Sequence, residues 1–193
     1  MSFLTHVKMT AFALFTLSAA SGFAQKEDDG RFDLPNGFRI GYQYSNLNNN
    51  DEDAADHLDR GYIGYVRKIK IVPLIHIETG LEYMIAGAQQ SDDIRLQLHY
   101  LTVPAQGVLK LGPFVGVAGL NGNFRIAEDF TVNGEKVDRD DDDRSAAFDL
   151  AVDAGAGFNI LFMTIEARYY WGLIEVDNGW YNRYWQAGLK FHF

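Results

Sequence analysis

The sequence predicts an all-β protein: a single eight-stranded antiparallel up-and-down transmembrane β-barrel, preceded by a cleavable signal peptide. Three features of the 193 residues support this prediction. An apolar run near the N-terminus is closed by small residues, eight later segments alternate apolar and polar residues, and the links between these segments are alternately short and long. The chain has no cysteine, which excludes disulfides and a lipid anchor on cysteine.

The N-terminal segment has the pattern of a secretory signal peptide. Lys8 precedes an apolar run from Thr10 to Ala20, and small residues lead from this run to a plausible cleavage site before Gln25. The run is shorter than the ~20 residues of a membrane-spanning helix, so a membrane anchor is the weaker interpretation. We expect residues 1–24 to be removed and residues 25–193 to form one barrel domain.

Four alternating segments make up the first half of the expected barrel. Residues 37–46 carry apolar side chains at even positions, whereas residues 74–87 carry them at odd positions. Residues 61–70 resemble a strand without a clear parity. Residues 94–103 are apolar at even positions, and we expect a one-residue bulge at Pro104 to reverse the alternation after it, because proline is tolerated in sheets mainly at bulges and edges.

Four further segments complete the barrel. Residues 113–124 are glycine-rich and leave their parity open, residues 147–159 are apolar at even positions, and residues 162–173 and 181–193 are apolar at odd positions. The links after the second, fourth and sixth segments are short, and the others are longer and polar. One end of the barrel therefore has tight turns and the other has loops, and both chain termini lie at the tight-turn end.

The alternation does not by itself say which face meets lipid, but bulk, aromatic placement and charge do. The polar set mixes glycines such as Gly155 with long charged side chains, and it fits a narrow barrel interior better than the ring-rich apolar set does. Aromatic residues collect at two levels, as in the interfacial girdles of outer-membrane barrels. An arginine facing lipid at the midplane would cost roughly 2–4 kcal/mol, which places Arg168 and Glu166 inside. Lipid also requires the first and last strands to pair, because an open edge would leave backbone groups unsatisfied.

Two stretches resemble known outer-membrane proteins. The terminal "WQAGLKFHF" resembles the C-terminal strand of bacterial outer-membrane barrels, and "YLTVPAQGVLKLGPFVGVAG", Tyr100 to Gly119, is similar to a segment of PorT-like barrels. The chain departs from that family after Pro104, where Ala-Gln-Gly replaces an apolar run. The resemblance implies a cell outer-membrane location and a possible link to a secretion assembly. It also implies recognition of the last strand by the barrel-insertion machinery, through Trp185, Leu189, Phe191 and Phe193.

The inward-facing set is the candidate functional site. A polar lumen could gate or conduct, but an eight-stranded barrel is narrow enough for side chains to fill, and buried charges need partners in any case. We therefore favour a plugged core of ion pairs and hydrogen bonds over a pore. The expected lumen network consists of His76, Glu78, Glu82, Arg95, His99, Asp149, Asp153, Glu166, Arg168 and Lys190.

No motif in the sequence indicates catalysis, a cofactor or a specific metal site. The acidic runs at 51–59 and 137–144 lack the spacing of a calcium loop and are better explained as solvated loops. Mature serines are few, and none has a histidine two residues away on the same strand. The net charge of −9 argues against nucleic acid as a partner.

We therefore expect a non-enzymatic outer-membrane protein with a structural or interaction role and acidic extracellular loops. Its expected partners are outer-membrane lipid, the barrel-insertion machinery and other envelope proteins. A lipid-modifying enzyme is the main alternative. A soluble lipocalin-like carrier and a narrow pore are weaker ones.

Overall fold

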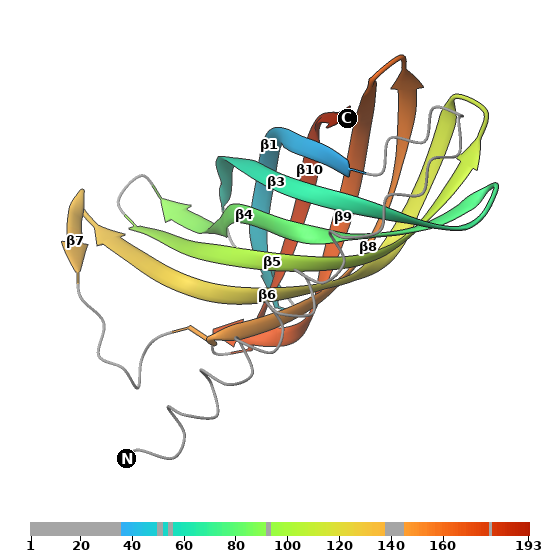
Figure 1. The fold of residues 1–193 in the computed structure, drawn as a ribbon. Coiled ribbons are helices and arrows are strands. Elements are labelled where there is room, and N and C mark those ends of the chain that lie inside the picture. Colours follow the sequence, from blue (N-terminus) through green and yellow to red (C-terminus); the bar gives the residue numbers. More distant parts are fainter. Residues whose placement is uncertain (1–35, 50–51, 54–55, 92–93, 138–144, 178) are drawn as a thin grey trace, which may run out of the picture. The chain divides into compact units, whose positions relative to one another are not determined.

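The computed structural model describes residues 36–49, 52–53, 56–91, 94–137, 145–177 and 179–193. They form a closed antiparallel barrel of eight long strands, as the sequence predicts (Figure 1). The predicted signal peptide lies outside this part of the chain. The long strands are β1 (Asn36–Asn49), β3 (Asp56–Val72), β4 (Ile75–Ser91), β5 (Ile94–Leu111), β6 (Phe114–Val132), β8 (Phe148–Ile160), β9 (Met163–Asp177) and β10 (Trp180–His192).

Two short strands extend the sheet at one end. β2 (Glu52–Asp53) pairs with the end of β1, and β7 (Glu135–Val137) pairs with the end of β6. The turn between β6 and β7 contains Asn133 and Gly134, both with positive φ, which is the preferred pair for a tight hairpin turn.

The barrel closes through its first and last strands. β1 and β10 pair without interruption from Gly37 opposite His192 to Asn48 opposite Tyr181. This pairing removes the open edges that lipid would not tolerate. The seam is tightest where Gly41 lies opposite Gly188, because the ring of Tyr62 on β3 lies against both glycines from the inside.

The two ends of the barrel differ as expected. Three tight turns join β3 to β4, β5 to β6 and β8 to β9, and we call this the turn end. Gly112 and Leu161 take positive φ in two of these turns. The opposite, loop end carries the longer connections. β3, β5 and β6 have 17, 18 and 19 residues, more than the ~9–11 that a strand needs to cross the hydrocarbon, so they extend beyond it at the loop end.

In the turn-end half the apolar side chains face outward. Ile77 and Ile165 are 43% and 48% exposed, whereas their neighbours Glu78 and Glu166 are buried. This is the orientation that the sequence predicts, and it is the one required of strands that meet lipid.

The expected reversal of β5 at Pro104 is wrong. The buried positions run without a change of phase from Leu96 through Pro104 to Val108. The bulge occurs in β6 instead, where His99 pairs with Ala127 but Tyr100 pairs with Arg125, so Ile126 is the extra residue. The apolar face of β5 therefore points inward near the loop end, because there the outer surface has risen out of the lipid.

No helix in the described ranges is long and apolar enough to cross a membrane.

Candidate functional site: the lumen and outer wall

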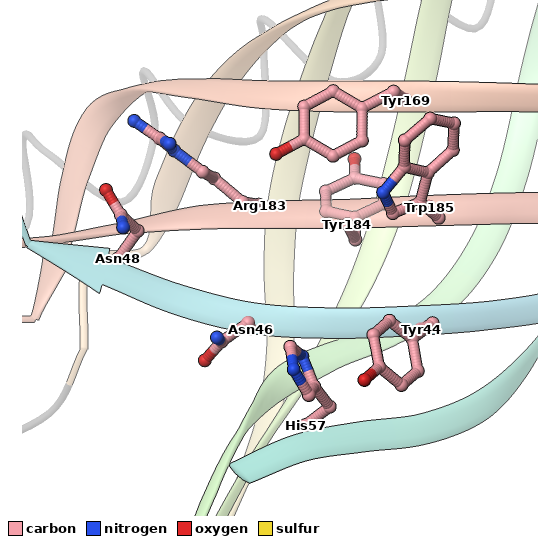
Figure 2. A pocket seen from close by; sticks show the side chains of 8 residues that line it. All are labelled: Tyr44, Asn46, Asn48, His57, Tyr169, Arg183, Tyr184 and Trp185. Carbon is pink, nitrogen blue, oxygen red and sulfur yellow. The ribbon is translucent and has the colours of Figure 1, made fainter. Parts of the chain in front are cut away.

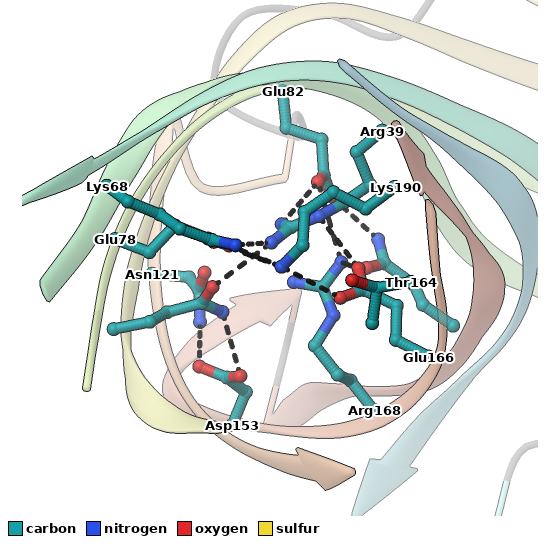
Figure 3. A network of polar contacts seen from close by, with 12 residues as sticks. Arg39, Lys68, Glu78, Glu82, Asn121, Asp153, Thr164, Glu166, Arg168 and Lys190 are labelled. Carbon is teal, nitrogen blue, oxygen red and sulfur yellow. Dashed lines mark hydrogen bonds and ion pairs between the residues drawn. The ribbon is translucent and has the colours of Figure 1, made fainter. Parts of the chain in front are cut away.

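Six charged side chains meet inside the turn-end half of the barrel (Figure 3). They come from β1, β4, β9 and β10, and none is more than 3% exposed. The strand period explains their placement, since Glu78 and Glu82 lie four residues apart on one face of β4. The cluster consists of Arg39, Glu78, Glu82, Glu166, Arg168 and Lys190, three cations against three carboxylates.

Arg39 is the hub of this ion cluster. Its guanidinium contacts Glu78, lies 3.2 Å from Oε2 of Glu82 and places Nε 2.8 Å from Oε1 of Glu166. Lys190 Nζ lies 3.0 Å from Glu78 and 3.1 Å from Glu166, and Arg168 Nη2 lies 3.1 Å from Glu166. Since every carboxylate has a cation, the cluster offsets the cost of burying charge.

A layer of amides and acids continues the network toward the loop end. Gln186 Nε2 donates to Oε1 of Gln43 and to Oε1 of Glu82, both at 2.9 Å. Two aspartates are held separately by amide donors. Asp153 accepts from Asn121 at 2.7 Å and Gln106 at 2.8 Å, and Asp149 accepts from Asn123 at 3.1 Å and Asn182 at 3.0 Å.

The loop-end half of the lumen is filled by aromatic and aliphatic side chains. Tyr170 and Tyr184 stack at 4.3 Å, and the guanidinium of Arg168 lies 5.6 Å from the Tyr170 ring, where the ion cluster meets this apolar fill. The lumen is therefore occupied at every described level. The apolar fill consists of Leu47, Tyr62, Met84, Ala86, Ala88, Leu96, Leu98, Tyr100, Tyr170, Val176 and Tyr184.

Eight of the ten predicted lumen residues lie inside the barrel, but they do not form one site. Five belong to the ion cluster, Asp149 and Asp153 are held by amides, and His76 is buried near the turn end. The prediction missed Arg39 and Gln43, although both lie on the polar face of residues 37–46. Their parity on that segment was the signal that could have found them.

Arg95 and His99 are corrections, because both lie on the outer wall. Arg95 Nε donates to Oε1 of Gln89 at 3.1 Å, and His99 Nδ1 lies 2.6 Å from the Tyr83 hydroxyl. His99 also faces Asp129, whose pKa is held below its usual range by the ammonium of Lys136. These polar groups face outward because the loop-end half of β5 stands above the apolar band.

The outer wall of the turn-end half is an apolar band between two aromatic levels. Phe114 and Phe158 meet at 5.3 Å near the turn end. Nearer the loop end, Tyr169 contacts Trp171 at 4.4 Å and Trp185 at 4.5 Å. Aromatic side chains of this kind mark the two interfaces of a membrane barrel.

The comparisons with known proteins agree with this geometry. Residues 23–178 match the family described as outer membrane protein beta-barrel domain. The chain belongs to this family. The outer membrane is its location, and the loop end is then the extracellular rim, since tight turns lie on the periplasmic side. A comparison with curated proteins found no match.

Solved structures share the fold of this outer-membrane barrel at low identity. The attachment invasion locus protein Ail of Yersinia pestis is 17% identical, with 82% of this chain and 99% of Ail covered and a TM-score of 0.50. Neisserial surface protein A is 12% identical, with 82% and 97% covered and a TM-score of 0.58. Ail has also been solved with the heparin analogue sucrose octasulfate.

The terminal residues that resemble an insertion signal all lie on the lipid face of β10. Trp185 and Phe193 are 55% and 58% exposed, and Leu189 and Phe191 share their face. In the closed barrel these side chains face lipid.

The structure brings no catalytic or metal constellation together in its described part. Ser45 is buried, and its hydroxyl lies 3.2 Å from the Leu58 carbonyl oxygen and 3.1 Å from that of Gly87. No group of three or more histidine or acidic side chains there is arranged to hold a metal ion. Most of the acidic run at 137–144 lies outside the described residues.

Proposed function

We propose that this outer-membrane barrel is a non-conducting, non-enzymatic support whose acidic extracellular rim binds a basic partner. The filled lumen is the observation that carries the proposal. Paired charges occupy the turn-end half, and tyrosines and aliphatic side chains occupy the loop-end half. An eight-stranded barrel leaves little further room, so ions and solutes would have no open path.

The charge of the rim favours a basic partner. The connection at 51–59 carries five acids, and the connection at 138–144 adds five more against two arginines. Asp129 and Glu135 are further acids on the part of the rim that the structure describes. Ail is solved with a sulfated polyanion. A polyanion would be repelled by this rim, whereas a surface rich in lysine and arginine would be attracted to it.

The resemblance of Tyr100 to Gly119 to PorT-like barrels supports an envelope or secretion assembly as the origin of that partner. We further propose that the last strand is the signal read by the barrel-insertion machinery. The change Phe193→Ser is then expected to reduce the amount of assembled barrel in the outer membrane. Phe162→Ser is the matched control, because Phe162 is equally exposed at 58% near the same end.

Two measurements on the purified barrel test the proposal. In planar lipid bilayers the wild type is expected to give no conductance steps. In solution it is expected to bind an oligolysine peptide, and changing Asp140, Asp141, Asp142 and Asp143 together to Asn should weaken that binding and reduce its dependence on salt.

A variant with the same four positions changed to Glu is the control. It keeps the charge and should bind the peptide like the wild type. Conductance by the wild type, or equal peptide binding by the Asn and Glu variants, would contradict the proposal. In cells, crosslinking from this connection should then identify the partner by its basic surface.

A further inference from the structure

A pocket of about 230 Å³ opens on the outer wall of the barrel, near the loop end (Figure 2). It crosses the closing seam, so it exists only when β1 and β10 are paired between β3 and β9. Apart from Tyr184, whose ring belongs to the apolar fill of the lumen, its lining residues face outward, and the pocket is separate from the ion cluster. Its lining residues are Tyr44, Asn46, Asn48, His57, Tyr169, Arg183, Tyr184 and Trp185.

The lining is graded along the barrel axis. Tyr44 lies opposite Trp185 across the seam, and one step nearer the rim Asn46 lies opposite Arg183. Figure 2 shows the rings of Tyr44, Tyr169 and Trp185 on the membrane side, and Arg183 and Asn48 toward the rim end of β1. Apolar rings therefore border the lipid band, and hydrogen-bonding groups lie where lipid headgroups begin.

The aromatic part of the pocket is fixed by its own contacts. Trp185 packs on Tyr169 at 4.5 Å, and the His57 ring stacks on Tyr44 at 4.1 Å. These rings are rigid compared with long side chains and sit at the upper aromatic level of the wall. Tyrosine and tryptophan are enriched at this depth because each offers an apolar body and a polar tip.

Arg183 supplies a positive charge that this part of the protein does not neutralise. Its guanidinium makes no ion pair or hydrogen bond with any residue that the structure describes. Two acids lie near Arg183 in register. Glu175, opposite Tyr181 on β9, accepts a hydrogen bond from the backbone N–H of Gly179, and Asp59, opposite Tyr44, accepts one from the hydroxyl of Tyr42. A guanidinium at the membrane interface matches a phosphate, which it can bind through two parallel hydrogen bonds.

The geometry points to a site for the phosphate-bearing headgroup of an outer-leaflet lipid, bound by Arg183 above a floor formed by Tyr44, Tyr169 and Trp185. The volume is below the ~300–1,000 Å³ of pockets that enclose a whole small molecule, so it suits a headgroup whose acyl chains continue down the apolar wall. Asn46 and Asn48 add amide groups beside the phosphate. The lining of the site is thus complementary to a lipid that is anionic at the top and apolar below.

Native mass spectrometry of the full-length barrel in detergent, titrated with phosphatidylglycerol or with diacylglycerol, which lacks the phosphate, tests this site. The wild type is expected to retain phosphatidylglycerol more tightly. Arg183→Gln should weaken phosphatidylglycerol binding about tenfold, the worth of one charge-assisted contact, and leave the binding of diacylglycerol, which has no phosphate, unchanged. Arg95→Gln is the matched control, because Arg95 is an outer-wall arginine away from the pocket, and it should bind both lipids like the wild type.

Three results would overturn the inference. Equal wild-type affinity for the two lipids would do so without any variant, so the test does not depend on the folding of Arg183→Gln. Equal loss in Arg183→Gln and Arg95→Gln would show a diffuse charge effect. Displacement of the lipid by millimolar inorganic phosphate would show a free-anion site in place of a lipid site.

Discussion

The ion cluster and the larger apolar cluster of the interior lie in different halves of the barrel, although Val108, Val115 and Val117 form a smaller buried apolar cluster near the turn end. In the turn-end half the interior holds Arg39 and Glu166 while Ile165 faces outward. In the loop-end half the interior holds Leu98 and Tyr100 while Arg95 and His99 face outward. Each half follows its own surroundings, since the first stands in lipid and the second in water. In the turn-end half the apolar side chains face outward and the charged ones inward. The loop-end half has the arrangement of a soluble protein, with apolar side chains inside and polar ones outside.

β5 contains both patterns without a break. Its inward positions keep one parity from Leu96 to Val108. They are all apolar up to Tyr100, and from Thr102 on they include the polar residues Thr102 and Gln106. The strand geometry is therefore constant, and only the chemistry of each face changes. The outward positions change in step, from Arg95, Gln97 and His99 to Ala105, Gly107 and Leu109, so the upper limit of the lipid band on β5 lies between these two groups.

Removing Arg39 should have the largest effect on the turn-end half. Arg39→Met leaves Glu78, Glu82 and Glu166 short of a cation in a dry interior, and we expect a loss of roughly 3–5 kcal/mol in the free energy of unfolding. Urea unfolding of the barrel in liposomes, followed by tryptophan fluorescence, measures it. Lys136→Ala removes a cation from the outer rim and should change stability by less than about 1 kcal/mol. Similar losses in both variants would show that the ion cluster is not insulated from water.

Adding a charge to the outer wall of each half tests directly which half faces lipid. Ile77→Arg places a cation in the lipid band and should cost roughly 2–4 kcal/mol in the same unfolding assay. Gln97→Arg makes the same kind of change on the outer wall of the loop-end half and should cost less than about 0.5 kcal/mol, as for an ordinary surface site. If both changes were tolerated equally, the lipid band would not extend over Ile77.

Filling the glycine seam tests how closely the interior is packed against its wall. A methyl group at Gly188 would lie 2.4 Å from the Ile40 carbonyl oxygen and from the Tyr62 hydroxyl, so Gly188→Ala should cost roughly 1–3 kcal/mol. At Gly116 the same methyl group would meet nothing within 4 Å, and Gly116→Ala should be neutral or slightly stabilising. A neutral Gly188→Ala would mean that Tyr62 does not pack on the seam.

The smallest effect on stability is expected from removing the carboxylate of Asp129 on the outer rim. The pKa of Asp129 is lowered in the folded protein by Lys136, so its stabilising contribution is present above its unfolded pKa and is lost as the pH falls through the folded value. Because the pair is partly exposed, Asp129→Asn should remove less than about 1 kcal/mol at neutral pH and nothing at low pH. Unfolding curves of both proteins from neutral to acid pH check this. A difference in the free energy of unfolding that grew as the pH fell would contradict the predicted direction.

The sequence contains most of the fold because a strand crossing lipid must alternate. Parity placed Glu78, Asp153 and Glu166 inside, and the short links located the turn end. Parity failed at Arg95 and His99 for a physical reason. Apolar side chains face lipid only within the membrane, and no residue in the sequence marks the level at which β5 leaves it.

The contacts that these side chains make with one another could be predicted even less from the sequence. Arg39 was on the polar face of its segment, but its contacts with Glu78 and Glu166 depend on how far each strand is shifted along its neighbours as the barrel closes. The pocket beside Arg183 depends on the same shift, because Asn46 and Arg183 are far apart in the chain and meet only across the seam. The alternation of apolar and polar residues predicts whether a side chain faces inward or outward, and the register between neighbouring strands determines which residues it contacts.

The boundary between the two halves can be measured along β5 itself. Since the chain has no cysteine, nitroxide labels can be placed one at a time from residue 95 to residue 109 and their exposure to oxygen and to a water-soluble nickel chelate compared. We expect oxygen exposure at Ala105→Cys, Gly107→Cys and Leu109→Cys, nickel exposure at Arg95→Cys, Gln97→Cys and His99→Cys, and little of either at the inward positions between them. Oxygen exposure at 95, 97 and 99, or nickel exposure at 106, would contradict a filled barrel that changes its surroundings midway along one strand.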